Sequence, residues 1–216
     1  MKEKSFERRN ELIEAALTEF SSHSYENASL NKIIKKTGIS KGTFYYHFED
    51  KKALYLFILG IAGEAQAEFI NKYMQGQDLR GQDIFEELKL QFKFSGAFAA
   101  EHPKYYRFIT MFMKEAEINT DLKSVLESGN DLLFDEMIKR AVTQGDFNNR
   151  FPIDFVIKIM HYLFINYFGI FDTEEDYQLE KMLENANNFV DFLKYGLGNQ
   201  KEDWTWVKSK NTQKVL

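Results

Sequence analysis

The sequence predicts an all-α protein, and three features support that fold class. Only 2 of the 216 residues are proline. No Asn-Gly or Asp-Gly pair joins alternating apolar runs, as tight β-hairpins would need. Apolar residues instead recur every three or four positions, the spacing of helices that bury one face. We expect a small N-terminal domain (residues 1–50), a larger helical domain (51–198) and a C-terminal tail (199–216).

Composition is that of a soluble globular protein. Hydrophobic residues make up 44% and charged residues 28% of the chain. The absence of cysteine excludes disulfides, thiolate zinc sites and a cysteine nucleophile, and it fits a reducing cytoplasm. The N-terminal residues are charged and lack an apolar segment, so we expect no export signal. The longest apolar run, residues 155–171, is shorter than the roughly 20 residues that cross a bilayer, so we expect a cytoplasmic protein without a membrane partner.

The first helices follow from apolar spacing and from capping residues. Four are predicted, over residues 5–21, 30–37, 41–48 and 51–75. Ser29, Ser40 and Asp50 are good N-caps for the last three of them. Gly38 suits the left-handed residue that ends a helix. Two short helices joined by a tight turn of this kind are typical of a helix-turn-helix.

Helices continue through the larger domain. Five more are predicted, over residues 82–101, 104–114, 122–144, 152–171 and 174–196. The fourth of these is apolar on all sides and should be covered on all sides. The tail is polar apart from a few residues such as Trp204 and Trp206, and its role is open.

The helix over residues 41–48 lies in the stretch GISKGTFYYHFEDKKAL (38–54) and carries an unusual set of side chains. Phe44 and Phe48 are four residues apart and can anchor the helix to its own domain. The adjacent rings of Tyr45, Tyr46 and His47 then point outward, which a closed aromatic core does not explain.

The first turn of this helix favours an anion. Lys41, Gly42 and Thr43 stand where free backbone N–H groups and the helix dipole attract phosphate, and glycine lets another backbone come close. The formal net charge is −5, but residues 29–52 hold six lysines against two acidic residues, a local balance of +4. A basic patch on an acidic body can grip phosphates, so we expect this helix to enter a major groove.

The stretch ASLNKIIKKTGISKGTFYYHFEDKKAL resembles the DNA-binding segment of the TetR/AcrR family of bacterial transcriptional regulators. The likeness covers about the first quarter of the chain; Phe44 stands where leucine is commoner. It implies that a set of polar and aromatic residues faces DNA: Ser29, Ser40, Lys41, Gly42, Thr43, Tyr45, Tyr46, His47 and Lys51. It further implies a ligand-responsive regulator, usually a repressor, that binds double-stranded DNA at a palindromic operator.

The helix over residues 174–196 offers a surface for a homodimer. An apolar stripe at helical spacing includes Met182, Leu183, Ala186, Phe189, Val190 and Leu193. The stripe can close the core of its own chain, or, as the resemblance implies, it can form a four-helix dimer bundle with the preceding helix. Two half-sites about 34–36 Å apart would then be bound together.

The middle helices are rich in aromatic residues, which can pack as core or line a pocket. The resemblance implies a small-molecule effector, apolar or aromatic, with candidate contacts at Phe94, Phe98, Tyr105, Phe108, Phe112, Phe134 and His161. His161 is a polar handle or an ordinary core histidine. No metal or cofactor is expected, because no ligand spacing suggests one.

Two other functions remain open from the sequence. A transcriptional activator would share the fold, and an all-α binding protein without DNA binding would share the aromatic interior. An enzyme is not expected, because the sequence lacks G-x-S-x-G, H-E-x-x-H and a dinucleotide fingerprint. For a regulator, the helix from Lys51 would connect the two domains, with Gly60 and Gly63 permitting a bend or close packing.

Overall fold

The computed structural model describes residues 8–78, 81–171 and 179–199. The all-α prediction is confirmed in this part of the chain, which forms helices and one isolated β-bridge between Phe147 and Gly198. The N-terminal helices are α1 (Arg9–Phe20), α2 (Leu30–Thr37), α3 (Lys41–His47) and α4 (Lys51–Met74). The later helices are α5 (Ile84–Glu101), α6 (Pro103–Ile118), α7 (Thr120–Gln144), α8 (Ile153–Ile165), α9 (Tyr167–Ile170) and α10 (Leu179–Leu197). The predicted tail, with Trp204 and Trp206, lies outside the described residues.

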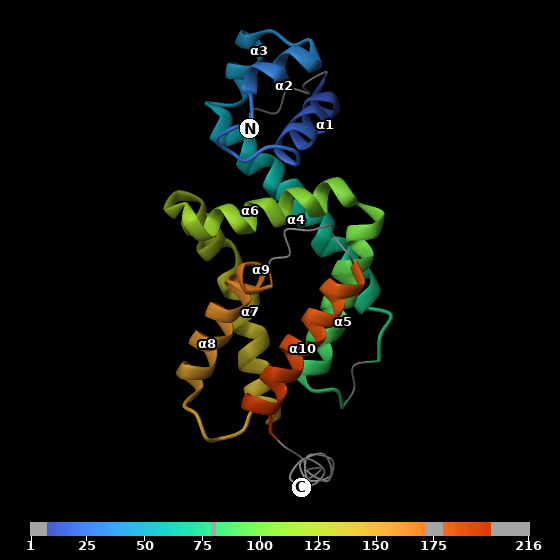
Figure 1. Ribbon diagram of the computed structural model, residues 1–216, viewed down its shortest axis with the longest axis vertical. Helices are drawn as coiled ribbons and strands as arrows, with labels where there is room; N and C mark the ends of the chain where they lie inside the picture. The colour runs from blue at the N-terminus through green and yellow to red at the C-terminus, as the bar shows by residue number, and fades with distance from the viewer. Residues whose placement is uncertain (1–7, 79–80, 172–178, 200–216) are drawn as a thin grey trace, which may run out of the picture.

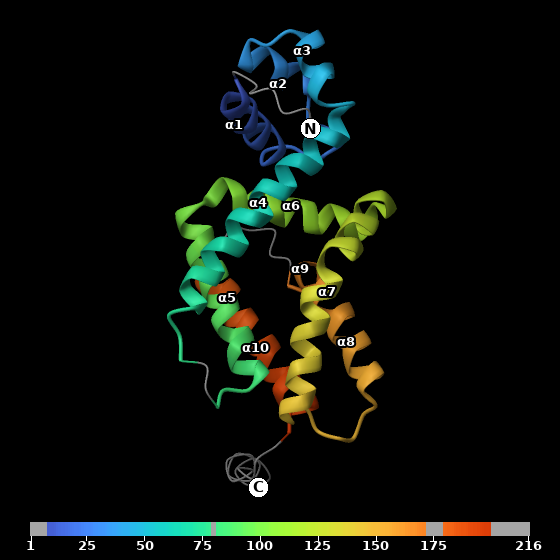
Figure 2. The same cartoon turned by 180° about the vertical axis from the view of Figure 1, so that it is seen from behind.

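The small N-terminal helices stand at one end of the molecule (Figure 1). Helix α4 leads away from them and runs beside α5, and α6 lies crosswise between the N-terminal helices and the remaining helices (Figures 1 and 2). Helices α5, α7, α8 and α10 fill the other end. Helix α6 therefore borders both ends of the protein.

Two clusters of buried apolar residues form the core. The first cluster joins α1, α2 and α3 to the first half of α4, and it also includes Phe108 and Phe112 of α6. The second cluster is built from α5, α7, α8, α9 and α10, with Phe85 and Val190 among its most buried members. The buried residues of α6 that belong to a cluster therefore pack with the N-terminal helices.

The predicted helix over residues 152–171 is divided in two. Asn166 interrupts it with backbone angles of φ −94° and ψ 11°, and its side-chain amide donates to the carbonyl of Tyr162 at 2.6 Å. The expectation that this segment is covered on all sides is wrong within one chain. Phe155, Tyr162 and Ile170 are 44%, 64% and 51% exposed.

Helix α4 is long and apolar enough to span a membrane by length and composition. In the folded chain it contacts α1, α5 and α6. Leu54, Ile58 and Ala62 along it are fully buried. The predicted close packing at Gly60 and Gly63 is absent, since a Cβ added at either glycine would meet nothing within 4 Å.

Candidate nucleic-acid interface

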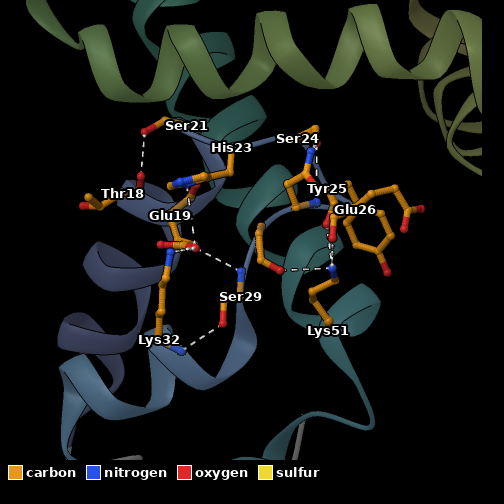
Figure 3. Close-up of polar contacts among 12 residues, drawn as sticks. Thr18, Glu19, Ser21, His23, Ser24, Tyr25, Glu26, Ser29, Lys32 and Lys51 are labelled. Carbon is orange, nitrogen blue, oxygen red and sulfur yellow. Dashed lines mark hydrogen bonds and ion pairs between the residues drawn. The ribbon is translucent and has the colours of Figure 1, made fainter.

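A polar network fixes the start of α2 (Figure 3). Ser29 is the N-cap, and its hydroxyl oxygen accepts a hydrogen bond from the backbone N–H of Lys32 at 3.3 Å. The carboxylate of Glu19 in α1 accepts from the backbone N–H of Ser29 at 3.0 Å and lies 3.8 Å from the Lys32 ammonium. The hydroxyl of the half-buried Ser29 thus caps α2.

The turn between α2 and α3 depends on Gly38. Its φ of 67° is left-handed, and its N–H donates to the carbonyl of Ile34 at 3.1 Å. The Arg8 guanidinium donates to the neighbouring carbonyl of Thr37 at 2.8 Å. A Cβ at Gly38 would lie 2.7 Å from that guanidinium nitrogen. The left-handed backbone angle favours glycine here, whereas the guanidinium at the end of the Arg8 side chain could shift to make room for a Cβ.

Helix α3 is capped as predicted. The Ser40 hydroxyl accepts from the backbone N–H of Thr43 at 3.0 Å, and the two hydroxyl oxygens lie 2.8 Å apart. The predicted anchors are confirmed: Phe44 and Phe48 are buried and stack with ring centroids 5.6 Å apart. Phe48 also packs against Phe57 of α4. These contacts hold α3 against its own domain and leave its other face outward.

The outer face of α3 carries hydroxyl-bearing rings beside lysines. Tyr45 and Tyr46 are 56% and 55% exposed. Lys35, Lys36 and Lys41 are exposed as well. Such a surface can donate several hydrogen bonds to phosphate oxygens and pack rings against sugars or bases.

Gly42 is not required by contacts within the chain. An added Cβ would meet only the Ser40 hydroxyl oxygen, at an ordinary 3.7 Å. Gly42 is exposed, and its φ is not in the left-handed region. Close approach of a partner from outside would account for glycine at this position.

Lys51, which the sequence predicts to contact DNA, binds backbone carbonyls of its own chain. Its ammonium donates to the backbone carbonyls of Tyr25, Glu26 and Ala28 at 2.6, 3.2 and 3.1 Å (Figure 3). It also stands 4.6 Å from the centre of the Tyr25 ring. The three N–H groups of an ammonium are all used by these carbonyls, so none is left for a phosphate. The residue stabilises the loop before α2 instead.

The described residues among the predicted effector contacts pack against other side chains of the chain, and their role as effector contacts stays a prediction. Phe108 and Phe112 belong to the first cluster, and Phe98 is fully buried among the rings of Phe69, His102 and Tyr105. Phe94 is buried against Tyr73, and the side chain of Phe134 lies outside the described part of the chain. His161 is hydrogen-bonded to Asp135 at 2.7 Å.

One cavity in the described part of the chain lies elsewhere. It has a volume of about 390 Å³ and is lined by residues of α5, of α10 and of the segment just before α5: Gln82, Glu86, Lys89, Leu90, Phe92, Lys93, Leu183 and Asn187. None of the predicted effector contacts lines it. Leu183 does, although the sequence assigned that residue to a dimer interface.

The apolar stripe of α10 faces inward. Ala186, Phe189, Val190 and Leu193 are at most 4% exposed and belong to the second cluster, so they are not available to a partner. Met182 is half-buried and accepts a hydrogen bond from the Tyr106 hydroxyl. The other face of α10 exposes large rings outside the predicted apolar stripe. Phe192 and Tyr195 are 69% and 55% exposed.

Residues that hold the N-terminal helices in place could not be recognised from the sequence. Arg8, Glu19 and Glu115 each make contacts to backbone groups far along the chain. Their sequence separations from these partners are 29, 10 and 90 residues, so no local spacing could reveal them.

Comparisons with known proteins agree with this geometry. Residues 12–57 match the family model of bacterial regulatory proteins of the tetR family. The chain is 23% identical to the biofilm operon icaADBC negative transcriptional regulator IcaR of Staphylococcus epidermidis, over 84% of this chain and 98% of that protein. It is also 23% identical to the transcriptional repressor AcnR of Corynebacterium efficiens, over 71% of this chain and 73% of that protein.

Solved structures share the fold. A TetR family transcriptional regulator from Chloroflexus aurantiacus aligns with a TM-score of 0.61 and 20% identity, covering 92% of this chain and 96% of that one. A regulator from Saccharomonospora viridis in complex with choline aligns with a TM-score of 0.59 and 20% identity, covering 90% and 99%. The likeness extends over the helices beyond residue 57.

Proposed function

We propose that this chain, which belongs to the TetR family of bacterial transcriptional regulators, represses transcription as a homodimer on a palindromic operator and is released by a small-molecule effector. The observation that carries the DNA-binding part is the outer face of α3. Exposed Tyr45 and Tyr46 stand beside Lys41 on a helix whose opposite face is buried. IcaR and AcnR are named as a negative regulator and a repressor, which favours repression over activation.

Helix α3 is proposed to lie in the major groove. Lys41 and the Tyr hydroxyls contact phosphates, and Thr43 reaches a base edge from the first turn. Gly42 lets the sugar-phosphate backbone come close. Ser29, Ser40 and His47 lie at or near the ends of the two helices and complete the proposed contact surface.

The test uses the DNA that flanks the protein's own gene in a gel shift at several salt concentrations. Sequence-preferring binding that weakens steeply with salt is expected, because released counterions drive phosphate binding. Lys41→Gln should reduce the slope of log affinity against log salt by about 1. Lys51→Gln should leave the slope unchanged, because its ammonium is bound to the loop. Absence of any shift would contradict the proposed function.

The proposed dimer surface is the outer face of α8 and α10. Phe155 and Tyr162 of α8, with Phe192 and Tyr195 of α10, are exposed large side chains. Both helices lie on the same side of the molecule (Figure 1), and their buried faces meet where Phe164 packs on Phe189. A second copy of the chain would cover these rings and pair two α3 helices at half-site spacing. Light scattering at micromolar concentration should show a dimer, and a monomer would contradict the assembly.

The effector is proposed to bind in the larger helical part. The second cluster is rich in rings, and the cavity beside α5 and α10 has an apolar wall of Leu90, Phe92 and Leu183. Its volume of about 390 Å³ suits a small ligand. A thermal-shift screen of apolar, aromatic and choline-like compounds should find one that raises the unfolding temperature and weakens DNA binding. A compound that stabilises the protein but leaves DNA affinity unchanged would not be the effector.

A further inference from the structure

Glu115 of α6 joins the DNA-binding helices to the rest of the molecule. It is half-buried, and its carboxylate accepts the backbone N–H of Tyr25 at 2.8 Å and the hydroxyl of Tyr55 at 3.2 Å. Tyr25 lies in the loop between α1 and α2, whereas Tyr55 lies in α4. One side chain of α6 thus contacts both elements that position α2 and α3.

The two tyrosines form part of a packed aromatic group. Their rings meet edge to face at 4.9 Å, and Tyr55 also packs on Phe20 and on Phe108 at 4.9 and 5.1 Å. Burial, together with the negative charge of Glu115, raises the pKa of Tyr55. The hydroxyl therefore stays protonated at neutral pH and donates to the carboxylate.

The loop is held from its other side by α4. We call Tyr25–Ala28 the connecting loop; Ser29, the N-cap of α2, follows it directly. The Lys51 ammonium binds three carbonyls of this loop, while Glu115 binds its first N–H. A cation of α4 and an anion of α6 thus fix a short segment whose end sets the start of α2.

We propose that Glu115 is a positioning residue for DNA binding, which fixes α2 and α3 relative to α6 through the connecting loop and Tyr55. This inference rests on the proposed function and deepens it. Helix α6 also contacts α5, α7 and α9, so its position depends on the larger helical part as well. A displacement that separates Glu115 from Tyr25 releases one side of the loop, and the recognition helices of a dimer lose their fixed spacing.

Other polar contacts across this junction are more exposed. Glu14 of α1 pairs with Lys104 at 3.3 Å, and Lys52 pairs with Asp121 at 3.3 Å. Glu14 and Asp121 are 62% and 79% exposed, and pairs of this kind contribute little in water. Glu14 therefore provides a matched control: its removal breaks a contact between α1 and α6 without touching the connecting loop.

The first experiment measures amide hydrogen exchange at Tyr25 in the full-length protein without DNA. Glu115→Ala should speed exchange of this amide about tenfold or more, because its acceptor is lost. Glu115→Gln keeps an acceptor oxygen and should restore most of the protection. Glu14→Ala should leave the rate unchanged. An unchanged rate in Glu115→Ala would overturn the proposal.

The second experiment measures affinity for the DNA that flanks the gene, with the same variants. Glu115→Ala should lower affinity about tenfold without changing the salt slope, and Glu115→Gln should recover most of it. Adding Lys51→Met to Glu115→Ala should lower affinity by less than the product of the single effects, because both act on one loop.

Two results would contradict the positioning role. The first is that Glu115→Ala binds DNA as tightly as the wild type although the Tyr25 amide exchanges faster. The second is that the double variant loses as much DNA affinity as the product of the two single losses. If the wild-type protein binds no DNA, the proposed function fails, whereas the exchange rates still decide whether Glu115 holds the loop.

Discussion

The boundary between the two core clusters does not coincide with the predicted domain boundary at residue 50. The first cluster includes Phe108 and Phe112, although both lie well beyond the expected boundary at residue 50. The second cluster contains members only from α5 and α7–α10. Helix α6 is thus part of the packing that supports α1–α3. A change in α6 must alter the DNA-binding end, whereas a change confined to the second cluster need not.

The largest effects should come from matched deletions in the two clusters. Phe108→Ala and Phe85→Ala each remove a fully buried ring and should lower the free energy of unfolding by about 3–5 kcal/mol, measured by urea denaturation. Because Phe108 packs on Phe20 and Tyr55, its loss should also weaken DNA binding about tenfold per folded molecule. Phe85→Ala should leave that affinity within about twofold. If both substitutions lowered DNA affinity equally, the first cluster would not support the DNA-binding end more than the second cluster does.

A second test addresses the outer surface of the second cluster. Phe192→Asp places a charge on the exposed face of α10 and should raise the dimer dissociation constant about 100-fold, measured by sedimentation or light scattering. Ile118→Asp is the control, since that residue is 90% exposed at the end of α6. A dimer that tolerates Phe192→Asp would require another interface.

A third test addresses the outer surface of the first cluster. Gly42→Ala should stabilise the folded chain by up to about 1 kcal/mol, because alanine favours a helix and its Cβ meets only Ser40 at 3.7 Å. The same methyl group should lower DNA affinity about tenfold if a DNA backbone approaches Gly42 closely. Thermal unfolding and a DNA titration measure the two effects. If the variant is more stable and binds DNA with unchanged affinity, Gly42 is not in the DNA interface.

The smallest effects are expected in α4, which belongs to the first cluster and runs on beside α5. Gly60→Ala and Gly63→Ala should each stabilise the protein by about 0.5–1 kcal/mol, because nothing lies within 4 Å of the added Cβ and alanine favours a helix. DNA affinity in the absence of effector should not change. A fall in the unfolding temperature would show that the glycines have a packing role.

Local interactions made the N-terminal helices predictable. The bounds of α2 follow from Ser29 at one end and Gly38 at the other, and the structure has both as caps. The buried pair Phe44 and Phe48 follows from a spacing of four residues. Capping and helical spacing act within a few residues, so the sequence states them directly.

Contacts between distant segments were not predictable in the same way. The sequence contains the apolar stripe of α10 but does not say whether Phe189 and Val190 meet their own chain or a partner. In the folded chain both are buried in the second cluster, and Phe192 is exposed instead. Aromatic residues of the middle helices are likewise divided between the clusters, with Phe108 in the first and Phe85 in the second.

The sequence by itself determined the helical class, the helix-turn-helix and the side chains that α3 turns outward. Tertiary structure decided what Lys51 and Glu115 do. Their partners in the connecting loop lie 23–26 and 90 residues away, and only folding brings a lysine of α4 and a carboxylate of α6 to the same loop. A lysine near the recognition helix can be assigned to DNA from the sequence, but in the folded chain its ammonium satisfies backbone carbonyls that would otherwise lack a partner within the protein.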